Sequence, residues 1–199
     1  MKKQFDQVYQ FKITLKEIKP PVWRGIQVPA SYSFWDLHVA IQDAMGWTDT
    51  HLHEFRIKNP KTRRKVNIGI PDEDFGSKVS SGWKKNIADF FTPENSMAEY
   101  TYDFGDSWRH EVELEAILPR QKGVTYPLCV DGARACPPED CGGPHGYENF
   151  LDIIKDINHD EHDSMLQWAG GEFHSEQFDC KEVAFDDPAE RLKDLEEDF

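Results

Sequence analysis

Apolar and polar residues alternate with a period of two in several segments of the chain, and this pattern predicts half-buried β-strands. The first such segments lie at residues 8–15, 22–28 and 51–57. Prolines at positions 20, 21 and 29 bound the second segment, since proline cannot continue a hydrogen-bonded strand. In the third segment the odd-numbered residues share one face. They are His51, His53, Phe55 and Ile57.

A β-hairpin is predicted further along the chain. Residues 100–104 and 108–118 form its arms, and Gly105 and Asp106 lie in the turn between them. The second arm places apolar side chains and two aromatic heterocycles on one face and mostly charged ones on the other. This pattern is typical of an antiparallel sheet with one solvated face.

Helical spacing of apolar residues appears at residues 34–45. Ser31 or Ser33 is expected to cap this helix, and Gly46 to end it. Residues 87–91 fit one helical turn, and residues 147–157 and 165–168 fit further helical segments. Asp187 and Pro188 are expected to begin a last helix. Residues 59–86 carry no clear pattern, and residues 119–146 are expected to be irregular.

This order of elements predicts an α+β fold. A mostly antiparallel sheet from the N-terminal two-thirds is expected to pack with helices, and the C-terminal third is expected to be helical. The length of 199 residues suits one domain covering residues 1–199, with an acidic helical segment from about residue 148.

Composition narrows the protein class. Aromatic residues make up 13% of the chain, which argues against a disordered protein, although the mean hydropathy is only -0.71. No apolar run is long enough to cross a membrane, and the first residues contain no apolar stretch typical of a secretory signal. A cytoplasmic protein without membrane contact is therefore expected.

The net charge of -14 is concentrated near the C-terminus. Residues 148–199 contain 17 acidic and 4 basic residues. Either this segment is a solvated face, or it docks a basic protein partner. A nucleic-acid partner is not expected, because phosphate binding needs a basic surface. The cations of residues 56–65 form a local exception, which we assign to a hairpin turn at Asn59 and Pro60.

Three cysteines and one histidine form a first candidate site. They are Cys129, Cys136, Cys141 and His145. Three thiolates and one imidazole can bind zinc, and zinc is the one cofactor that the sequence suggests. The spacing of the cysteines, however, lacks the paired C-x2-C motifs typical of zinc sites. The alternative is a set of reduced thiols, because structural disulfides are rare in the cytoplasm.

A second candidate site combines the two strands that carry histidines. It contains His51, His53, Asp103, Asp106 and His110. If these strands are neighbours, the imidazoles and carboxylates of His53, Asp106 and His110 are expected to share one recess. Such a recess suits a divalent metal or acid–base chemistry. The alternative is that the histidines belong to the core and the aspartates form turns.

Several short motifs together resemble the plasmid-pRiA ORF-three-like family, over about residues 5–190. They include Pro20-Pro21-Val22-Trp23-Arg24, His51-Leu52-His53-Glu54-Phe55, Tyr102-Asp103-Phe104-Gly105-Asp106-Ser107-Trp108-Arg109-His110 and Ala135-Cys136-Pro137-Pro138-Glu139-Asp140. The resemblance implies a protein of a largely uncharacterised family, some of whose members are described as resolvase-like passengers of insertion elements. This chain contains no serine within an arginine cluster, which a serine recombinase requires.

The resemblance also implies where a binding pocket would lie. The residues that match recurring polar and aromatic positions of the family are Arg24, His53, Asp103, Asp106, Trp108, His110, Glu139 and Asp140, and His51 is added from the strand pattern. We interpret the protein as an accessory that binds a small ligand, a peptide or a metal. The alternatives are a metal-dependent hydrolase and a mobile-element-associated DNA-processing accessory. No motif in the sequence identifies a catalysed reaction.

Overall fold

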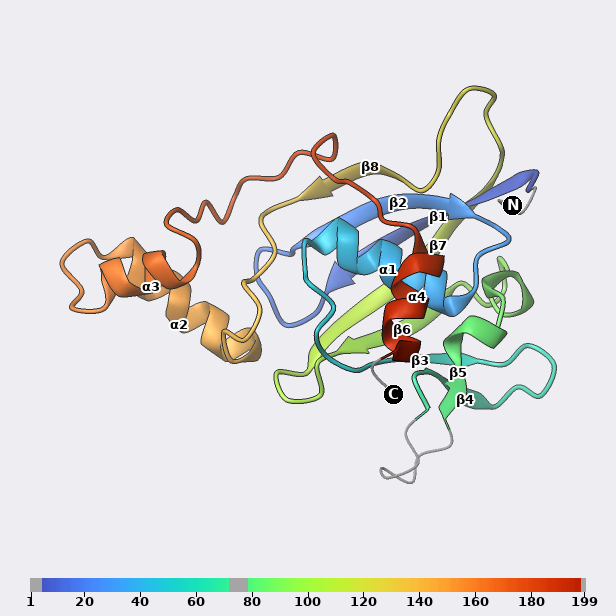
Figure 1. Ribbon diagram of the computed structural model, residues 1–199, viewed down its shortest axis with the longest axis horizontal. Helices are drawn as coiled ribbons and strands as arrows, with labels where there is room; N and C mark the ends of the chain where they lie inside the picture. The colour runs from blue at the N-terminus through green and yellow to red at the C-terminus, as the bar shows by residue number, and fades with distance from the viewer. Residues whose placement is uncertain (1–4, 72–78, 198–199) are drawn as a thin grey trace.

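The computed structural model describes residues 5–71 and 79–197, and one eight-stranded sheet forms the body of this part of the chain (Figure 1). The spatial order of the strands is β5-β4-β3-β6-β7-β1-β2-β8, and every neighbouring pair is antiparallel except β4 and β5. The strands are β1 Gln7–Leu15, β2 Trp23–Pro29, β3 His53–Lys58, β4 Lys65–Gly69, β5 Val79–Ser81, β6 Met97–Tyr102, β7 Trp108–Pro119 and β8 Leu128–Ala133. The predicted α+β class and mostly antiparallel sheet are confirmed.

The alternating pattern of the predicted hairpin determines which side chains enter the core. In β7, Trp108, His110 and Val112 are almost fully buried, whereas Glu111 between them is exposed. The turn at residues 103–107 joins β6 to β7 as predicted. The positive residues of 56–65 lie on the β3–β4 hairpin, whose turn is closed by a hydrogen bond from Asn59 N to Arg64 O of 2.8 Å.

Helix α1, Phe34–Met45, packs its apolar side on the sheet. Ser33 caps its N-terminus in a reciprocal capping box with Asp36, and Gly46 ends it in the left-handed conformation with φ 90°. Both predicted boundaries are confirmed. Helix α4, Pro188–Glu197, lies against α1, where the Trp35 indole donates to Pro188 O at 2.8 Å (Figure 1).

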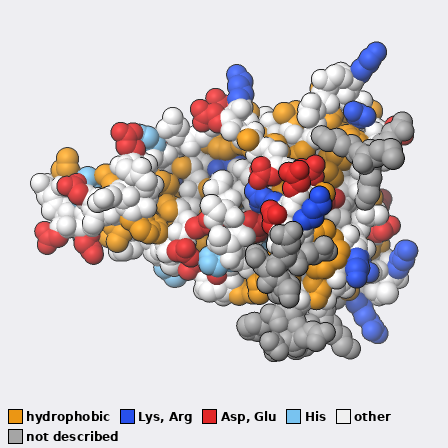
Figure 2. All heavy atoms as spheres, in the orientation of Figure 1, with side chains coloured by type: hydrophobic (Ala, Val, Ile, Leu, Met, Phe, Trp, Pro, Cys, Tyr) orange, Lys and Arg blue, Asp and Glu red, His pale blue; other side chains and the backbone are white. Residues whose placement is uncertain are grey.

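Helices α2, Gly143–Lys155, and α3, His162–Trp168, form an arm that projects beyond one end of the sheet (Figure 1). Tyr147 and Phe150 of α2 are buried and join the arm to the core. Several acidic side chains are scattered over the visible face of this arm, among apolar and uncharged ones (Figure 2). None of the helices within residues 5–71 and 79–197 is long and apolar enough to cross a membrane.

The C-terminal third contains less helix than the sequence pattern predicts. Residues 169–187 form no helix. Gly170 and Gly171 both adopt positive φ and end α3, and the segment that follows has no apolar spacing to start another helix. Strand β8, within residues expected to be irregular, is an edge strand held by main-chain pairing with β2, and Cys129 is its one buried residue among those described.

Candidate functional site

Three chain segments meet at one end of the sheet and bring His51, Asp103 and Asp140 together. His51 precedes β3, Asp103 follows β6, and Asp140 lies in the loop between β8 and α2. The register that pairs His53 with Tyr102 places Asp103 beside Leu52, whose carbonyl accepts from the Asp103 amide at 3.0 Å. One ligand atom of each side chain lies within 4.8 Å of the other two.

The turn after β6 orients the Asp103 carboxylate. Its Oδ1 accepts a hydrogen bond of 2.8 Å from the Gly105 amide, so that Oδ2 faces His51 Nε2 at 3.8 Å. Asp103 adopts φ 53°, a left-handed conformation that aspartate tolerates better than most residues. The side chain is only 12% exposed. The turn therefore holds Oδ1 in a hydrogen bond with the backbone and leaves Oδ2 directed toward His51.

Asp140 approaches from the opposite loop. Its Oδ1 lies 3.1 Å from His51 Nε2, and its side chain is 69% exposed. His51 Nε2 therefore faces two carboxylates at once, and a single nitrogen can donate to them only with its one proton. The site combines one imidazole nitrogen with two carboxylate oxygens and is open to solvent on the side of Asp140.

Glu139 fastens the Asp140 loop to the sheet. Its Oε1 accepts from the Tyr102 hydroxyl at 2.6 Å, and its Oε2 accepts from the Thr48 amide at 2.9 Å and from the Thr48 hydroxyl. The Tyr102 oxygen in turn accepts from the Thr50 amide at 3.0 Å. Burial, and then the neighbouring Glu139 carboxylate, raise the pKa of Tyr102, so its hydroxyl remains a donor. Glu139 thus positions the segments on both sides of the site.

Asp106 and Gly143 hold the same loop on its other side. Asp106 Oδ2 accepts from the Gly142 amide at 3.0 Å. A Cβ on Gly143 would lie 2.5 Å from Asp106 O, and Gly143 has φ 70°. Only glycine fits this close approach. Asp106 therefore lies at the border of the site as a loop anchor, whereas the sequence placed it among the converging side chains.

The two other histidines of the predicted recess are core residues. His53 and His110 lie on the same face of the sheet on either side of β6, with ring centroids 6.0 and 5.2 Å from that of Tyr100. Both are buried. Burial lowers the pKa of His110 to about 4 and lowers that of His53 well below its usual value. The two rings therefore do not line an open recess together with Asp106.

His53 instead stacks on His38, which belongs to α1, the helix predicted at residues 34–45. The ring centroids are 3.4 Å apart and the planes differ by 10°. His38 Nδ1 lies 2.8 Å from the Tyr100 oxygen, and Nε2 lies 2.8 Å from Asp49 Oδ1. Neither nitrogen of His53 has a hydrogen-bond partner within the described structure.

His38 and His53, which are buried, and Asp49, which is half-buried, have ligand atoms within 4.8 Å of one another. The lone pairs of an imidazole lie in the ring plane, and two parallel stacked rings direct them side by side rather than at one point. A metal ion would require one ring to rotate within a packed core. We therefore favour the open group as the metal-binding candidate.

Arg24 and Trp108 contribute to the core. Arg24 is 1% exposed and donates to the carbonyl oxygens of Ala44, Trp23 and Ala133 at 2.8, 2.9 and 3.1 Å. Its guanidinium lies over the Phe178 ring at 3.7 Å. Trp108 is 1% exposed and contacts Trp47. Arg24 thus joins β2, α1 and β8, and neither side chain reaches the open group.

The predicted zinc ligands do not converge. Cys129, Cys136 and Cys141 are free thiols, and neither metal-compatible group within the described residues contains a cysteine. The His145 side chain is fully exposed on α2. Burial raises the pKa of Cys129 to about 11 and of Cys141 to about 12, so without a bound metal both are protonated thiols near neutral pH. The alternative of reduced thiols agrees with this arrangement.

The comparisons with known proteins agree with the family resemblance. The chain is 33% identical to the uncharacterized protein y4hQ of Sinorhizobium fredii (strain NBRC 101917 / NGR234), over 94% of this chain and 92% of the relative. The crystal structure of protein MM3350 of unknown function from Methanosarcina mazei Go1 superposes with a TM-score of 0.86 at 48% identity. That match covers 92% of this chain and all of the other. Because the family model also matches residues 7–182, the chain belongs to the plasmid pRiA4b ORF-3-like protein family.

Proposed function

We propose that the protein binds a divalent transition-metal ion through His51, Asp103 and Asp140, and that it acts as a metal-binding accessory protein. The observation that supports this most is the meeting of three ligand atoms within 4.8 Å from three separate chain segments. Each segment is held by its own hydrogen bonds, through Gly105, Thr50 and Glu139. A site built in this way does not need the metal to gather its ligands.

Charge gives a physical reason for a cation to bind. Two carboxylate oxygens within 4.8 Å repel each other by about 1 kcal/mol in water and about 3 kcal/mol near a protein surface. Within the described part of the chain, His51 is the one basic side chain that pairs with either of them. A bound divalent cation would remove this repulsion and replace the imidazole proton.

The donor set selects the class of metal. One imidazole nitrogen and two carboxylate oxygens suit zinc, manganese or iron better than calcium or magnesium, which prefer oxygen ligands alone. Three protein ligands leave coordination positions for water or for a ligand. The 69% exposure of the Asp140 side chain keeps those positions accessible.

Isothermal titration calorimetry with zinc and manganese tests this proposal. We expect one ion per wild-type chain, and at least about tenfold weaker binding by Asp103→Asn, which keeps the oxygen that caps Gly105 but loses the charge. His162→Ala is the matched control, because His162 lies 2.8 Å from Asp163 without a third ligand. Equal affinity in wild type and Asp103→Asn would refute the assignment.

A second candidate function is metal-dependent hydrolysis, which the open coordination positions favour because a metal-bound water is a nucleophile near neutral pH. Release of nitrophenol from bis-nitrophenyl phosphate tests it. Metal-dependent turnover that is lost in Asp103→Asn would support it, and metal binding without turnover would leave the binding role alone. The net charge of -14 favours neither a DNA-processing role nor nucleic acid as the ligand.

A further inference from the structure

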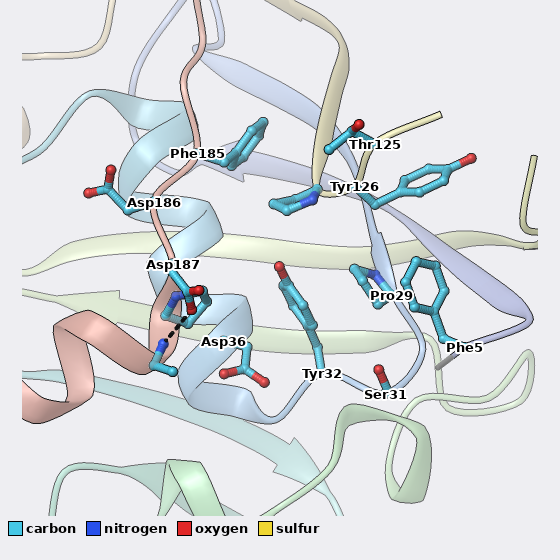
Figure 3. A pocket seen from close by; sticks show the side chains of 13 residues that line it. Phe5, Pro29, Ser31, Tyr32, Asp36, Thr125, Tyr126, Phe185, Asp186 and Asp187 are labelled. Atoms are coloured by element: carbon cyan, nitrogen blue, oxygen red, sulfur yellow. Dashed lines mark hydrogen bonds between the residues drawn. The ribbon is translucent and has the colours of Figure 1, made fainter. Parts of the chain in front are cut away.

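A cavity of about 660 Å³ lies apart from the metal candidate site (Figure 3). Three segments surround it: the end of β2 with the turn before α1, the loop before β8, and the chain leading into α4. Its volume lies within the range of small-molecule sites. None of His51, Asp103 or Asp140 lines it. The cavity is therefore a separate candidate site that shares none of the proposed metal ligands.

Aromatic rings and prolines form most of the cavity wall. The aromatic residues are Phe5, Tyr32, Tyr126 and Phe185, and the prolines are Pro29, Pro127 and Pro188. Phe5 and Tyr126 support each other edge to face, with ring centroids 6.0 Å apart. Figure 3 shows Tyr32 between these two rings and the chain that enters α4. The cavity thus offers aromatic surface to a ligand, while one face of Phe5 lies against the Arg120 guanidinium, 4.6 Å from the ring centroid.

The charged residues of the wall are all acidic. They are Asp36, Asp186 and Asp187, and they gather on the side of the chain leading into α4 (Figure 3). Asp186 is paired with Arg191 through hydrogen bonds of 3.1 and 2.8 Å, and Asp187 Oδ1 accepts from the Ala189 amide at 3.0 Å. Local hydrogen bonds therefore fix these carboxylates along one wall.

Acidic side chains also lie near Tyr32, which lines the cavity. The pKa of Tyr32 is raised, first by burial and then by the charges of Asp36, Asp187 and Asp43. An anionic ligand would be repelled by the same charges. A neutral ligand would cover the carboxylates without compensating for their lost hydration.

We propose that this cavity binds an organic cation with an apolar body, of the alkylated ammonium class. Such a group has no strong hydrogen bonds to water to lose, and it is attracted both by aromatic faces and by nearby carboxylates. A metal ion fits less well, since apolar rings and prolines form most of the wall.

Calorimetric titration with choline, and with its uncharged carbon analogue 3,3-dimethyl-1-butanol, tests the proposal on the full chain. We expect saturable choline binding that is at least about fivefold tighter than binding of the neutral analogue. Tyr32→Leu and Asp187→Asn are each expected to weaken choline binding at least about threefold. Asparagine is also a good helix cap, so Asp187→Asn should keep the fold if Tyr32→Leu does not.

Asp163→Asn on α3 is the matched control, because this aspartate is fully exposed and distant in the sequence from the cavity wall. It should bind choline as the wild type does. The absence of choline binding at millimolar concentration would overturn the proposal. So would equal binding of the neutral analogue, or unchanged choline binding by Asp187→Asn.

Discussion

The ring of His53 on β3 stacks face to face on the ring of His38 on α1, with centroids 3.4 Å apart. Both rings are buried between the helix and the sheet. The two nitrogens of His38 form hydrogen bonds with the Tyr100 hydroxyl and the Asp49 carboxylate. His53 gains no hydrogen bond from this burial, within the structure described. Packing therefore stabilises its neutral form, and protonation opposes folding.

Stability should consequently fall in mild acid. The folded pKa values of His53 and His110 are both lowered, and that of His110 reaches about 4. A lowered histidine pKa means that the unfolded chain binds the proton first, so stability is fully present above about pH 6.5 and is lost as the pH falls toward 4. His110 alone should account for about 2 kcal/mol of this loss between pH 7 and pH 5. Urea unfolding at pH 7 and pH 5 measures it.

His53→Phe should reduce the difference in unfolding free energy between pH 7 and pH 5, because it removes one proton-binding group without breaking a hydrogen bond. His145→Ala removes a fully exposed ring and should leave this free-energy difference unchanged. An identical loss in wild type and His53→Phe would show that the buried pair does not carry the pH dependence.

Much of the fold could be predicted from the sequence because local patterns agree with it. The capping residue Ser33, the terminating Gly46 and the alternation in β7 each report a physical requirement of one element. Strand β8 escaped prediction because it is held by pairing with β2 at the sheet edge, which leaves little alternation in its own residues.

The candidate site was predicted in part. His51, Asp103 and Asp140 were all expected near a pocket, but the expected partner of His53 was His110. The distance between two strands of one sheet cannot be read from either strand, and β6 lies between these two. His38 was missed because its helical spacing matches a core position, and no sequence signal indicates that a ring will stack on it.

Gly143→Ala should damage the site without touching a ligand. A methyl group would collide with Asp106 O and add strain at φ 70°, so we expect a loss of about 2 kcal/mol in unfolding free energy and weaker metal binding. Gly170→Ala is the control, since it also has positive φ but nothing within 4 Å of its Cβ. Denaturant unfolding of both variants compares them, and equal losses would argue against the tight loop contact.

Glu139→Gln should weaken metal binding by about tenfold or more, although Glu139 does not reach the metal. The amide can keep the hydrogen bond from Tyr102 but would turn a donor toward the Thr48 amide. Unchanged affinity in a folded variant would mean that Asp140 does not depend on this tether. Calorimetry with zinc provides the comparison.

Removal of metal should leave the fold intact. The loops of the site are joined by protein hydrogen bonds, and the thiols within the described residues form no metal-compatible group. Thermal unfolding in excess EDTA should therefore remain cooperative, while a hundredfold excess of zinc over its Kd should add about 2.7 kcal/mol. Complete unfolding by EDTA would indicate a structural metal elsewhere.

The most direct test of the account is anomalous diffraction from crystals soaked with manganese or zinc. A single peak is expected within about 2.0–2.2 Å of His51 Nε2, Asp103 Oδ2 and Asp140 Oδ1. A peak between His38 and His53, a peak at the cysteines, or no peak at all would contradict the proposed site.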